Sequence, residues 1–397
     1  MKNKRILIIG LTVLLIILVV IAVVLKLNKK EKSIEDMTVE EKVDYYMDKM
    51  TIDEKIAQML ILYYTNDTVD DNLKGIIENH NPGGFIITKD NITTYENTKK
   101  FISDLKAASE IPLIISIDQE GGNVQRLQGI TDTEVLNIPY MYNLGSTNEE
   151  DLAYQVGKVM AEQLKTIGVN VVYAPVVDIY SNPSNSVIGE RSFGTNKETV
   201  SLMSIALAKG LEDNGIVATY KHFPGHGDTD IDSHANLPII NKTLDELYDL
   251  ELVPFKEAIK NNAKLIMIGH LSLPDIVGDN TPASLSSKIV TDLLKNDLGY
   301  DGLVITDALN MGALTNDYSY EEIYTKAIEA GCDLLLMPNG SSNAITYIKK
   351  NISEERINES VRKILTFKFT YLKDYDLLDK SYLNNSSQQE IISRIPE

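Results

Sequence analysis

Short apolar runs alternate with longer amphipathic segments over most of this chain. The runs are rich in Ile, Val and Leu and alternate only weakly with polar residues, which is typical of strands buried on both faces. They occupy residues 59–62, 84–87, 112–117, 169–174, 217–220, 264–268, 302–306 and 333–337. The stretches between them have helical periodicity, for example at residues 98–108, 151–167, 199–214 and 244–261. This alternation indicates an α/β protein with a parallel sheet.

The number of these units predicts one architecture and leaves an alternative. Eight strand–helix units over roughly 330 residues suit a single closed (β/α)8 TIM-type barrel. An open doubly wound sheet is the alternative. Polar residues directly after several runs favour the barrel, because strand ends converge on one rim in a barrel and spread along an edge in an open sheet. These residues are Asp118, Lys221, His222, His270 and Asp307.

The amino-terminal segment differs from the rest of the chain. Residues 6–25 are almost wholly apolar, and Lys2, Lys4 and Arg5 precede them. About twenty apolar residues are enough to cross a bilayer as a helix. Because no small-residue cleavage site follows, the segment predicts an N-terminal transmembrane anchor helix. We therefore expect a membrane partner and a large domain outside the cytoplasm, with a cleaved and secreted form as the alternative.

Composition divides the chain into four parts. Residues 1–25 are the anchor or signal segment, 26–50 are typical of a charged stalk, 51–375 form the predicted barrel domain, and 376–397 are typical of a polar tail. The 397 residues carry a formal net charge of −19, which a solvated acidic surface explains. Nucleic acid is not an expected partner, since phosphate binding requires a basic face. The sole cysteine, Cys332, excludes an internal disulfide and a Cys-rich metal centre.

Candidate chemistry is concentrated in residues 221–234, which contain three of the five histidines. Asp232 and His234 are two residues apart, so both side chains can face one way in an extended loop. A carboxylate in that position can orient the imidazole, which can then donate and accept a proton. The alternative interpretation is an ordinary polar loop.

Two further interpretations concern metal binding and Asp307. Zinc could bind the clustered histidines, but Pro224 and Gly225 oppose the helix that the usual metalloprotease spacing needs, so we expect neither a metal nor a cofactor.

Asp307 directly follows an apolar run. A carboxylate there is either a nucleophile or base, or a helix N-cap. The other polar residues expected on the same rim favour the functional role.

Several motifs, in order along the chain, resemble glycoside hydrolase family 3, and within it the bacterial β-N-acetylglucosaminidases. The resemblance covers about residues 50 to 370, and the run Lys-His-Phe-Pro-Gly-His-Gly-Asp is its most specific part. Asn123 departs from the family, which usually has Arg there. The motifs are Asp118-Gln119-Glu120-Gly121-Gly122, residues 182–194, residues 221–234 with Leu237-Pro238, Gly269-His270 and Ile305-Thr306-Asp307-Ala308-Leu309.

The resemblance implies a retaining, exo-acting β-N-acetylglucosaminidase that acts on cell-wall or chitin-type glycans. It implies that Asp307 is the nucleophile, His234 the acid/base and Asp232 its partner. It also implies a set of residues that hold the sugar in the first subsite, namely Asp118, Arg126, Arg191, Lys221 and His222.

Two other functions stay open from the sequence. A membrane-tethered, non-catalytic glycan-binding protein could use the same rim, although binding alone does not require both a nucleophile and an acid/base. A metal-dependent barrel hydrolase is the third possibility. The natural glycan, the choice between hydrolysis and phosphorolysis, and the oligomeric state are not determined by these motifs.

Overall fold

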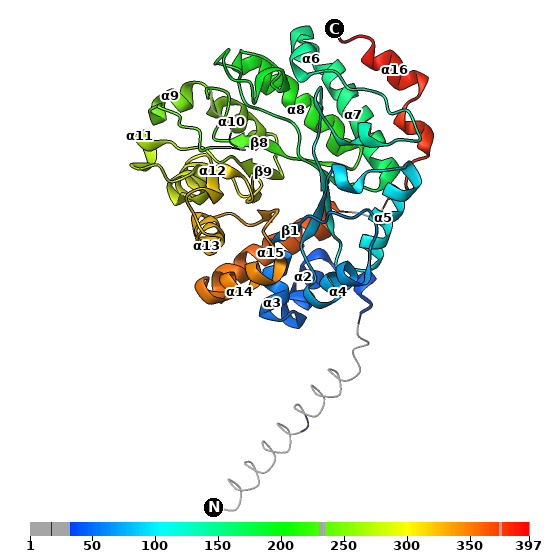
Figure 1. The fold of residues 1–397 in the computed structure, drawn as a ribbon, viewed down its shortest axis with the longest axis vertical. Helices are drawn as coiled ribbons and strands as arrows, with labels where there is room; N and C mark the ends of the chain where they lie inside the picture. Colours follow the sequence, from blue (N-terminus) through cyan, green and yellow to red (C-terminus); the bar gives the residue numbers. More distant parts are fainter. Residues whose placement is uncertain (1–16, 18–31, 230–232, 234, 373–374, 397) are drawn as a thin grey trace, which may run out of the picture.

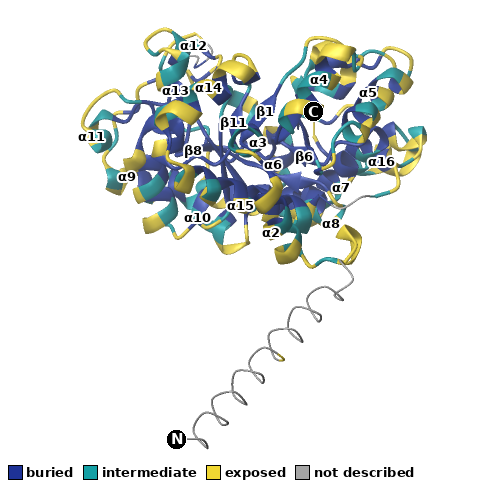
Figure 2. Cartoon of the chain, turned by 90° about the horizontal axis from the view of Figure 1, so that it is seen from below, coloured by how far each residue is buried: buried dark blue, intermediate teal, exposed yellow. Residues whose placement is uncertain are grey.

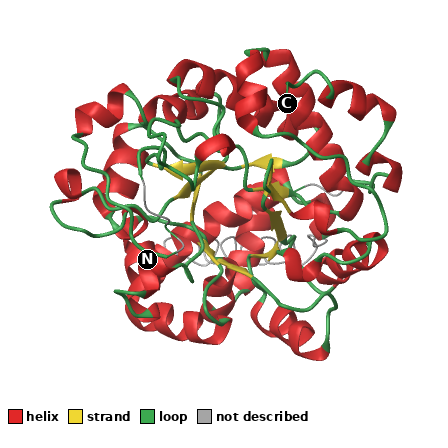
Figure 3. Ribbon diagram, turned by 45° about the horizontal axis from the view of Figure 1, so that its top comes forward, coloured by secondary structure: helices red, strands yellow, loops and turns green. Residues whose placement is uncertain are grey.

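The computed structural model describes residues 17, 32–229, 233, 235–372 and 375–396. Helices surround a central set of short strands (Figures 1 and 3). The strands are buried, whereas the outward faces of the helices are exposed (Figure 2). This is the arrangement that strands buried on both faces require.

Each predicted apolar run contains a parallel strand, so the α/β prediction is confirmed. The strands are short because only the central residues of each run meet a neighbour in register. Their bounds are β1 Leu60–Leu62, β2 Gly84–Ile87, β3 Ile114–Ile117, β6 Val171–Val172, β7 Val217–Ala218, β8 Tyr220–Phe223, β9 Leu265–Ile268, β10 Leu303–Thr306 and β11 Leu335–Leu336. A small antiparallel pair, β4 Gln119–Gly121 with β5 Val124–Gln125, follows β3.

The prediction of a single closed (β/α)8 TIM-type barrel is wrong, because the parallel strands form two curled sheets. One sheet has six strands in the order β11-β1-β2-β3-β6-β7, and the other has three in the order β10-β9-β8. Isolated bridges, Val176↔Lys221 and Ile305↔Leu334, join the sheets in place of continuous ladders. Thr219 separates β7 from β8, and the register of β8 on β9 shifts, so the hydrogen bonding does not continue around a cylinder.

The helices lie between successive strands and pack their apolar faces inward. The long helix α7, for example, buries Leu152, Val156 and Leu164 and packs along α8. The helices are α2 Val39–Lys49, α3 Ile52–Gln58, α4 Asp71–His80, α5 Tyr95–Ala107, α6 Met141–Thr147, α7 Glu150–Ile167, α8 Lys197–Asp213, α9 Leu244–Asp249, α10 Leu252–Lys260, α11 Pro274–Val277, α12 Gly312–Thr315, α13 Tyr320–Ala330, α14 Ser341–Asn351, α15 Glu354–Tyr371 and α16 Ser386–Ile392, with a π-helix at Lys288–Asp297.

One predicted helix, 244–261, is divided into α9 and α10. Pro254 lies in the first turn of α10, and its ring would clash with the carbonyl group of Leu250 in a continuous helix. Leu250 accordingly leaves the helical region, with φ −132° and ψ −79°. A short break between the two helices follows from this proline.

The described parts of both end segments pack on the body. In the predicted stalk, α2 lies against α15, where the ring of Tyr46 stacks on Phe369 with centroids 5.6 Å apart. In the predicted tail, α16 contacts α7, and Leu383 is fully buried. The carbonyl oxygen of Leu383 accepts hydrogen bonds from the backbone N–H of Leu136 and from Gln163. The boundaries between the four sequence segments stay a prediction.

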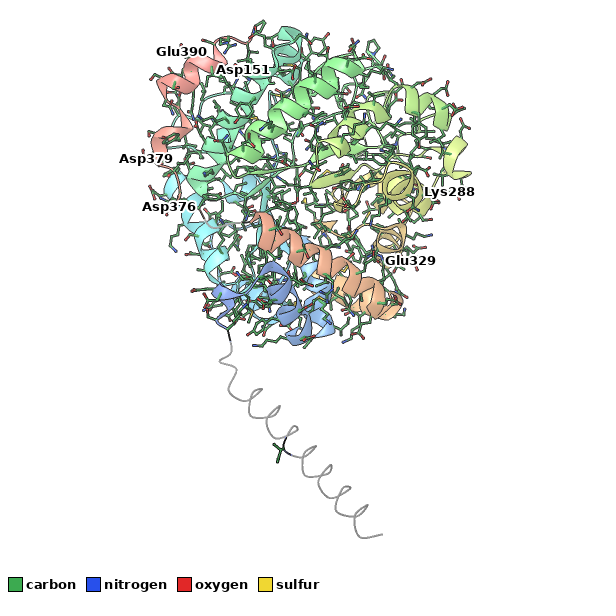
Figure 4. All side chains as sticks on the ribbon, turned by 180° about the vertical axis from the view of Figure 1, so that it is seen from behind. Asp151, Lys288, Glu329, Asp376, Asp379 and Glu390 are labelled. Carbon is green, nitrogen blue, oxygen red and sulfur yellow. The ribbon has the colours of Figure 1, made fainter. Side chains whose placement is uncertain are left out.

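The predicted N-terminal transmembrane anchor helix is not supported. In the part of the chain that the structure describes, no helix is both long enough and apolar enough to cross a bilayer. The predicted segment, residues 6–25, falls outside the described residues except for Ile17. At the surface of the described domain, charged side chains such as Asp151, Glu329 and Glu390 lie on the outline of the molecule (Figure 4).

Candidate active site

A cavity of about 560 Å³ opens where the parallel strands end. Asp118 directly follows β3, Lys221 and His222 belong to β8, and Asp307 directly follows β10. Segments that are far apart in sequence therefore bring the polar residues at their strand ends to one place, as in other parallel α/β sites. Among the residues predicted for the site, the structure places six in the cavity wall, and these are Asp118, Arg126, Arg191, Lys221, His222 and Asp307.

The predicted acid/base pair, Asp232 and His234, lies outside the described residues. Ser233, between them in sequence, is described and lines the cavity. Its carbonyl oxygen accepts a hydrogen bond from the backbone N–H of Ala313, at 3.2 Å. Ser233 is therefore tied to the segment that follows Asp307, and the roles of its two neighbours stay predictions.

An ion cluster with buried Lys221 and Glu120 at its centre forms one wall of the cavity. The amino group of Lys221 is 3.0 Å from Oδ1 of Asp118 and 2.6 Å from Oε1 of Glu120. The guanidinium group of Arg191 donates two hydrogen bonds of 2.8 Å to the two oxygens of Glu120. Arg126 reaches Asp118 from the other side, at 3.5 Å. Direct contacts thus hold Lys221, Glu120 and Arg191, and the free donors and acceptors of the cluster are preorganised for a polar ligand.

The charges in this cluster stabilise one another. Burial acts to lower the pKa of Lys221, but the carboxylates of Glu120 and Asp118 outweigh burial and raise it. Burial acts to raise the pKa of Glu120, but Arg191 and Lys221 outweigh burial and hold the pKa far below its ordinary value. Both groups are therefore charged at neutral pH.

Glu120 is a site residue that the sequence interpretation did not single out. It belongs to β4 and is 2% exposed. The turn after it needs glycine, since Gly122 has φ 53° and a Cβ atom there would lie 2.2 Å from the ring of Tyr140. Glu120 is two residues after Asp118, a spacing that puts both carboxylates on one side of an extended chain. That spacing is the sequence signal that could have identified Glu120.

Asp307 lines the cavity and is partly accessible. Its backbone N–H donates to the carbonyl oxygen of Ile268, and its Oδ1 accepts from the N–H of Ala308 at 2.8 Å. Burial acts to raise the pKa of Asp307, but interactions with His222 and His270, and the hydrogen bond from the N–H of Ala308, outweigh burial and lower the pKa. The group is thus an anion at neutral pH. The N-cap alternative is wrong, because the next helix, α12, has Met311 as its N-cap.

His270 binds the backbone next to Asp307. Its ring is fully buried, with Nε2 3.1 Å from the carbonyl oxygen of Ala308 and Nδ1 2.8 Å from Oγ of Ser284. A carbonyl oxygen can only accept, so Nε2 carries a proton; in the neutral ring, Nδ1 then accepts from the hydroxyl group. This arrangement fixes the peptide that follows the proposed nucleophile.

His226 holds the loop that leads towards Ser233. Its Nδ1 is 2.9 Å from Oγ1 of Thr229, and its Nε2 is 3.2 Å from Oγ of Ser233. Burial, and next the interaction with His222, lower the pKa of His226 to about 4. The ring is therefore neutral at pH 7, with both nitrogens engaged by hydroxyl groups. Within the described residues, no group of three or more His, Cys, Asp or Glu side chains could hold a metal ion.

Asp178 is a second residue that the sequence interpretation missed. It lies after β6, is fully buried, and accepts hydrogen bonds from the loop that carries His222 and His226. Asp178 is separated from its apolar run by Pro175, Val176 and Val177, so a search for polar residues directly after each run passes over it. No local sequence motif around Asp178 distinguishes it from a surface aspartate.

The comparisons with known proteins identify the family to which this fold and cavity belong. The chain belongs to glycosyl hydrolase family 3, because the profile described as "Glycosyl hydrolase family 3 N terminal domain" matches residues 51–367. This confirms the resemblance drawn from the motifs.

Within this family, the chain is similar to proteins named as hexosaminidases. The chain is 35% identical to "Beta-hexosaminidase A" of Pseudoalteromonas piscicida, over 68% of this chain but only 48% of that protein. It is also 35% identical to "Beta-hexosaminidase" of Nitrosomonas eutropha, over 66% of this chain and 75% of that protein. A solved family 3 β-N-acetylglucosaminidase from Paenibacillus sp. str. FPU-7 superposes with a TM-score of 0.82 and 33% identity, covering 87% of this chain and 68% of that one. This chain thus spans about half the length of the first of these relatives.

Proposed function

We propose that this protein is a retaining, exo-acting β-N-acetylglucosaminidase that releases terminal N-acetylglucosamine from cell-wall or chitin-type glycans. The names of its relatives support the activity and the class of sugar. The observation that carries the mechanism is the anionic Asp307, which lines a cavity with the Lys221–Asp118–Glu120–Arg191 ion cluster in its wall. An ionised carboxylate beside fixed hydrogen-bonding groups suits attack on a bound sugar.

In the first step, a carboxylate oxygen of Asp307 attacks the anomeric carbon. The bond from that carbon to the aglycone oxygen breaks, and this oxygen takes a proton from His234. A covalent glycosyl-enzyme forms. Asp232 stabilises the imidazolium form of His234 before the transfer and keeps the ring oriented.

In the second step, His234 removes a proton from water, and the resulting oxygen nucleophile attacks the anomeric carbon. The ester bond to Asp307 breaks, and the sugar leaves with its original β-configuration. A neutral histidine base has one advantage over a second carboxylate here. It places no additional anion beside Asp307, whose negative charge returns as the ester breaks.

The charged wall would hold the sugar while both steps occur. Lys221, Arg126 and Arg191 can only donate hydrogen bonds, whereas Asp118 can only accept them when ionised. A pyranose presents hydroxyl groups that do both. Fixed partners of both kinds would orient the ring with its anomeric carbon over Asp307.

The test is turnover of 4-nitrophenyl N-acetyl-β-glucosaminide by the full chain, with the anomer of the first product read by NMR. Hydrolysis with release of the β-anomer supports the proposal, and an α-anomer as the first product contradicts the retaining mechanism. Asp307→Ala should abolish turnover. Parallel product analysis on peptidoglycan fragments and on chitobiose would identify the glycan, and added phosphate would reveal phosphorolysis as a sugar 1-phosphate product.

A further inference from the structure

Asp178 is a fully buried carboxylate directly behind the cavity wall. Its Oδ2 is 2.7 Å from Nδ1 of His222, and its Oδ1 accepts from the backbone N–H of His226, also at 2.7 Å. The backbone N–H of His222 lies 3.2 Å from each of the two oxygens. One carboxylate therefore binds both the side chain and the backbone of His222.

The chemistry of this pair determines where the ring proton is. Burial alone would raise the pKa of Asp178, but His222 and the hydrogen bonds outweigh burial and lower it. An ionised carboxylate can only accept hydrogen bonds, so Nδ1 of His222 carries a proton. The other nitrogen, Nε2, is then at the end of the ring that faces away from Asp178. His222 itself lines the cavity that contains Asp307.

The surrounding backbone leaves the ring little freedom. A Cβ atom at Gly269 would lie 3.0 Å from Cβ of His222, so the neighbouring strand end packs closely against the histidine. A Cβ atom at Gly227 would lie 1.6 Å from the carbonyl oxygen of Ile179. The loop is thus pressed against the segment that carries Asp178, and the pair is held by packing as well as by hydrogen bonds.

We propose that Asp178 is a positioning residue for the reaction: it holds His222 with the proton on Nδ1 and so presents Nε2 to the sugar beside Asp307. This rests on the proposed glycosidase function. Asp178 touches neither the sugar nor Asp307 and acts through His222. With the proton on Nδ1 and none on Nε2, His222 accepts a hydrogen bond from a sugar hydroxyl group at Nε2, whereas the opposite tautomer would present a donor there.

The direct test is the Asp178→Asn variant, which keeps the shape of the side chain. The new amide has one oxygen in place of two and so cannot accept from all the former donors. Its NH2 group can donate to Nδ1 of His222, and the ring proton then moves to Nε2. We expect kcat on 4-nitrophenyl N-acetyl-β-glucosaminide to fall about 100-fold while KM changes less than about threefold, because a wrong tautomer harms the transition state more than ground-state binding.

A double-mutant cycle with His222→Ala shows whether the effect passes through His222. If it does, adding Asp178→Asn to His222→Ala produces little further loss of kcat/KM. The matched control is Asp333→Asn, another fully buried carboxylate, which accepts from the N–H of Val304 and from Ser360 away from the cavity. This control should lose stability and keep kcat.

A measurement on the unaltered protein keeps the proposal testable if Asp178→Asn does not fold. Imidazole ¹⁵N NMR, with the His222 signal assigned by its loss in His222→Ala, should show a proton on Nδ1. A ring protonated at Nε2 alone would overturn the proposal. So would an unchanged kcat in folded Asp178→Asn, multiplicative losses in the cycle, or an equal loss of kcat in Asp333→Asn. An unaltered chain with no glycosidase turnover would instead contradict the proposed function and leave the tautomer result standing.

Discussion

The amino group of Lys221 and the carboxylate of Glu120 are 2.6 Å apart, and their side chains are 3% and 2% exposed. Two opposite charges withdrawn from water to this extent depend on each other, because each would be strongly destabilising alone. Arg191 completes the arrangement by binding both oxygens of Glu120. The wall of the cavity is therefore also a buried structural element.

Replacing Glu120 by Gln should reduce both stability and activity. Lys221 and Arg191 would keep their charges without the shared anion, so we expect the free energy of unfolding to fall by about 3 kcal/mol. We also expect kcat/KM to fall at least about tenfold, since the donors of the wall lose their fixed positions. Urea unfolding and steady-state kinetics measure the two effects.

The control for Glu120→Gln is Glu321→Gln, which removes the partner of Lys350 in an exposed ion pair. Exposed pairs contribute less than about 1 kcal/mol, so this variant should resemble the parent protein. Equal losses of stability in the two variants would show that the burial of the cluster has no special effect.

His226 should make the folded state less stable below neutral pH. Its pKa is about 4 in the folded chain and 6.5 ordinarily, so between these values the unfolded state binds more protons. The stabilisation is complete above pH 6.5 and is lost as pH falls towards 4. Between pH 7.5 and pH 5 the unaltered protein should lose about 2 kcal/mol more than His226→Gln. Urea unfolding at the two pH values tests this, and equal losses would contradict it.

Lys368 should give a pH dependence of the same sign, at higher pH. The side chain is fully buried in α15 and donates a 2.7 Å hydrogen bond to Oε1 of Gln58, and burial lowers its pKa to about 7. Above pH 7 the folded state releases a proton that the unfolded state retains up to its ordinary pKa of 10.5. Stability should therefore rise by about 2 kcal/mol from pH 7 to pH 9 through this group.

The comparison protein for this prediction is Lys368→Met, which has no titrating group at the same buried position. Its unfolding free energy should lack the rise between pH 7 and pH 9. A parallel rise in both proteins would assign the effect to another group.

His234→Ala should discriminate between leaving groups. General acid help is typically worth about 10²–10⁴-fold, and 4-nitrophenolate leaves with little such help. The variant should therefore lose at least about tenfold more activity on chitobiose than on the 4-nitrophenyl substrate. Asp307→Ala, in which the covalent step is removed, should lose activity on both. Similar losses of His234→Ala on the two substrates would contradict the acid role of this residue.

The strands were predictable because burial on both faces leaves a strong apolar pattern, as in Leu265–Ile268 and Leu303–Thr306. Whether the sheet closes into a barrel was not predictable, because closure depends on a few hydrogen bonds between distant segments. The ladder of hydrogen bonds is interrupted at Thr219, for example. Membrane insertion depends on a segment that the described residues hardly include.

The cavity residues were predictable where a polar side chain directly follows an apolar run, as Asp118 and Asp307 do. Glu120 and Asp178 were not singled out, because a buried carboxylate is recognisable only through partners that folding brings to it. Those partners, Lys221 and His222, are consecutive residues of one strand, and each binds a carboxylate from a different segment. The tertiary fold, and not local spacing, creates these pairs.

The packing of the last residues against α7 has a practical consequence for anyone shortening this protein. The family match stops at residue 367, which makes a truncation near that point tempting. Such a fragment would lack Leu383, Ile392 and Ile395, all of which are buried. Removing them would uncover part of α7 and leave the side-chain amide of Gln163 with one of its two acceptors, the carbonyl oxygen of Leu136, so recombinant versions should retain the chain through Ile395.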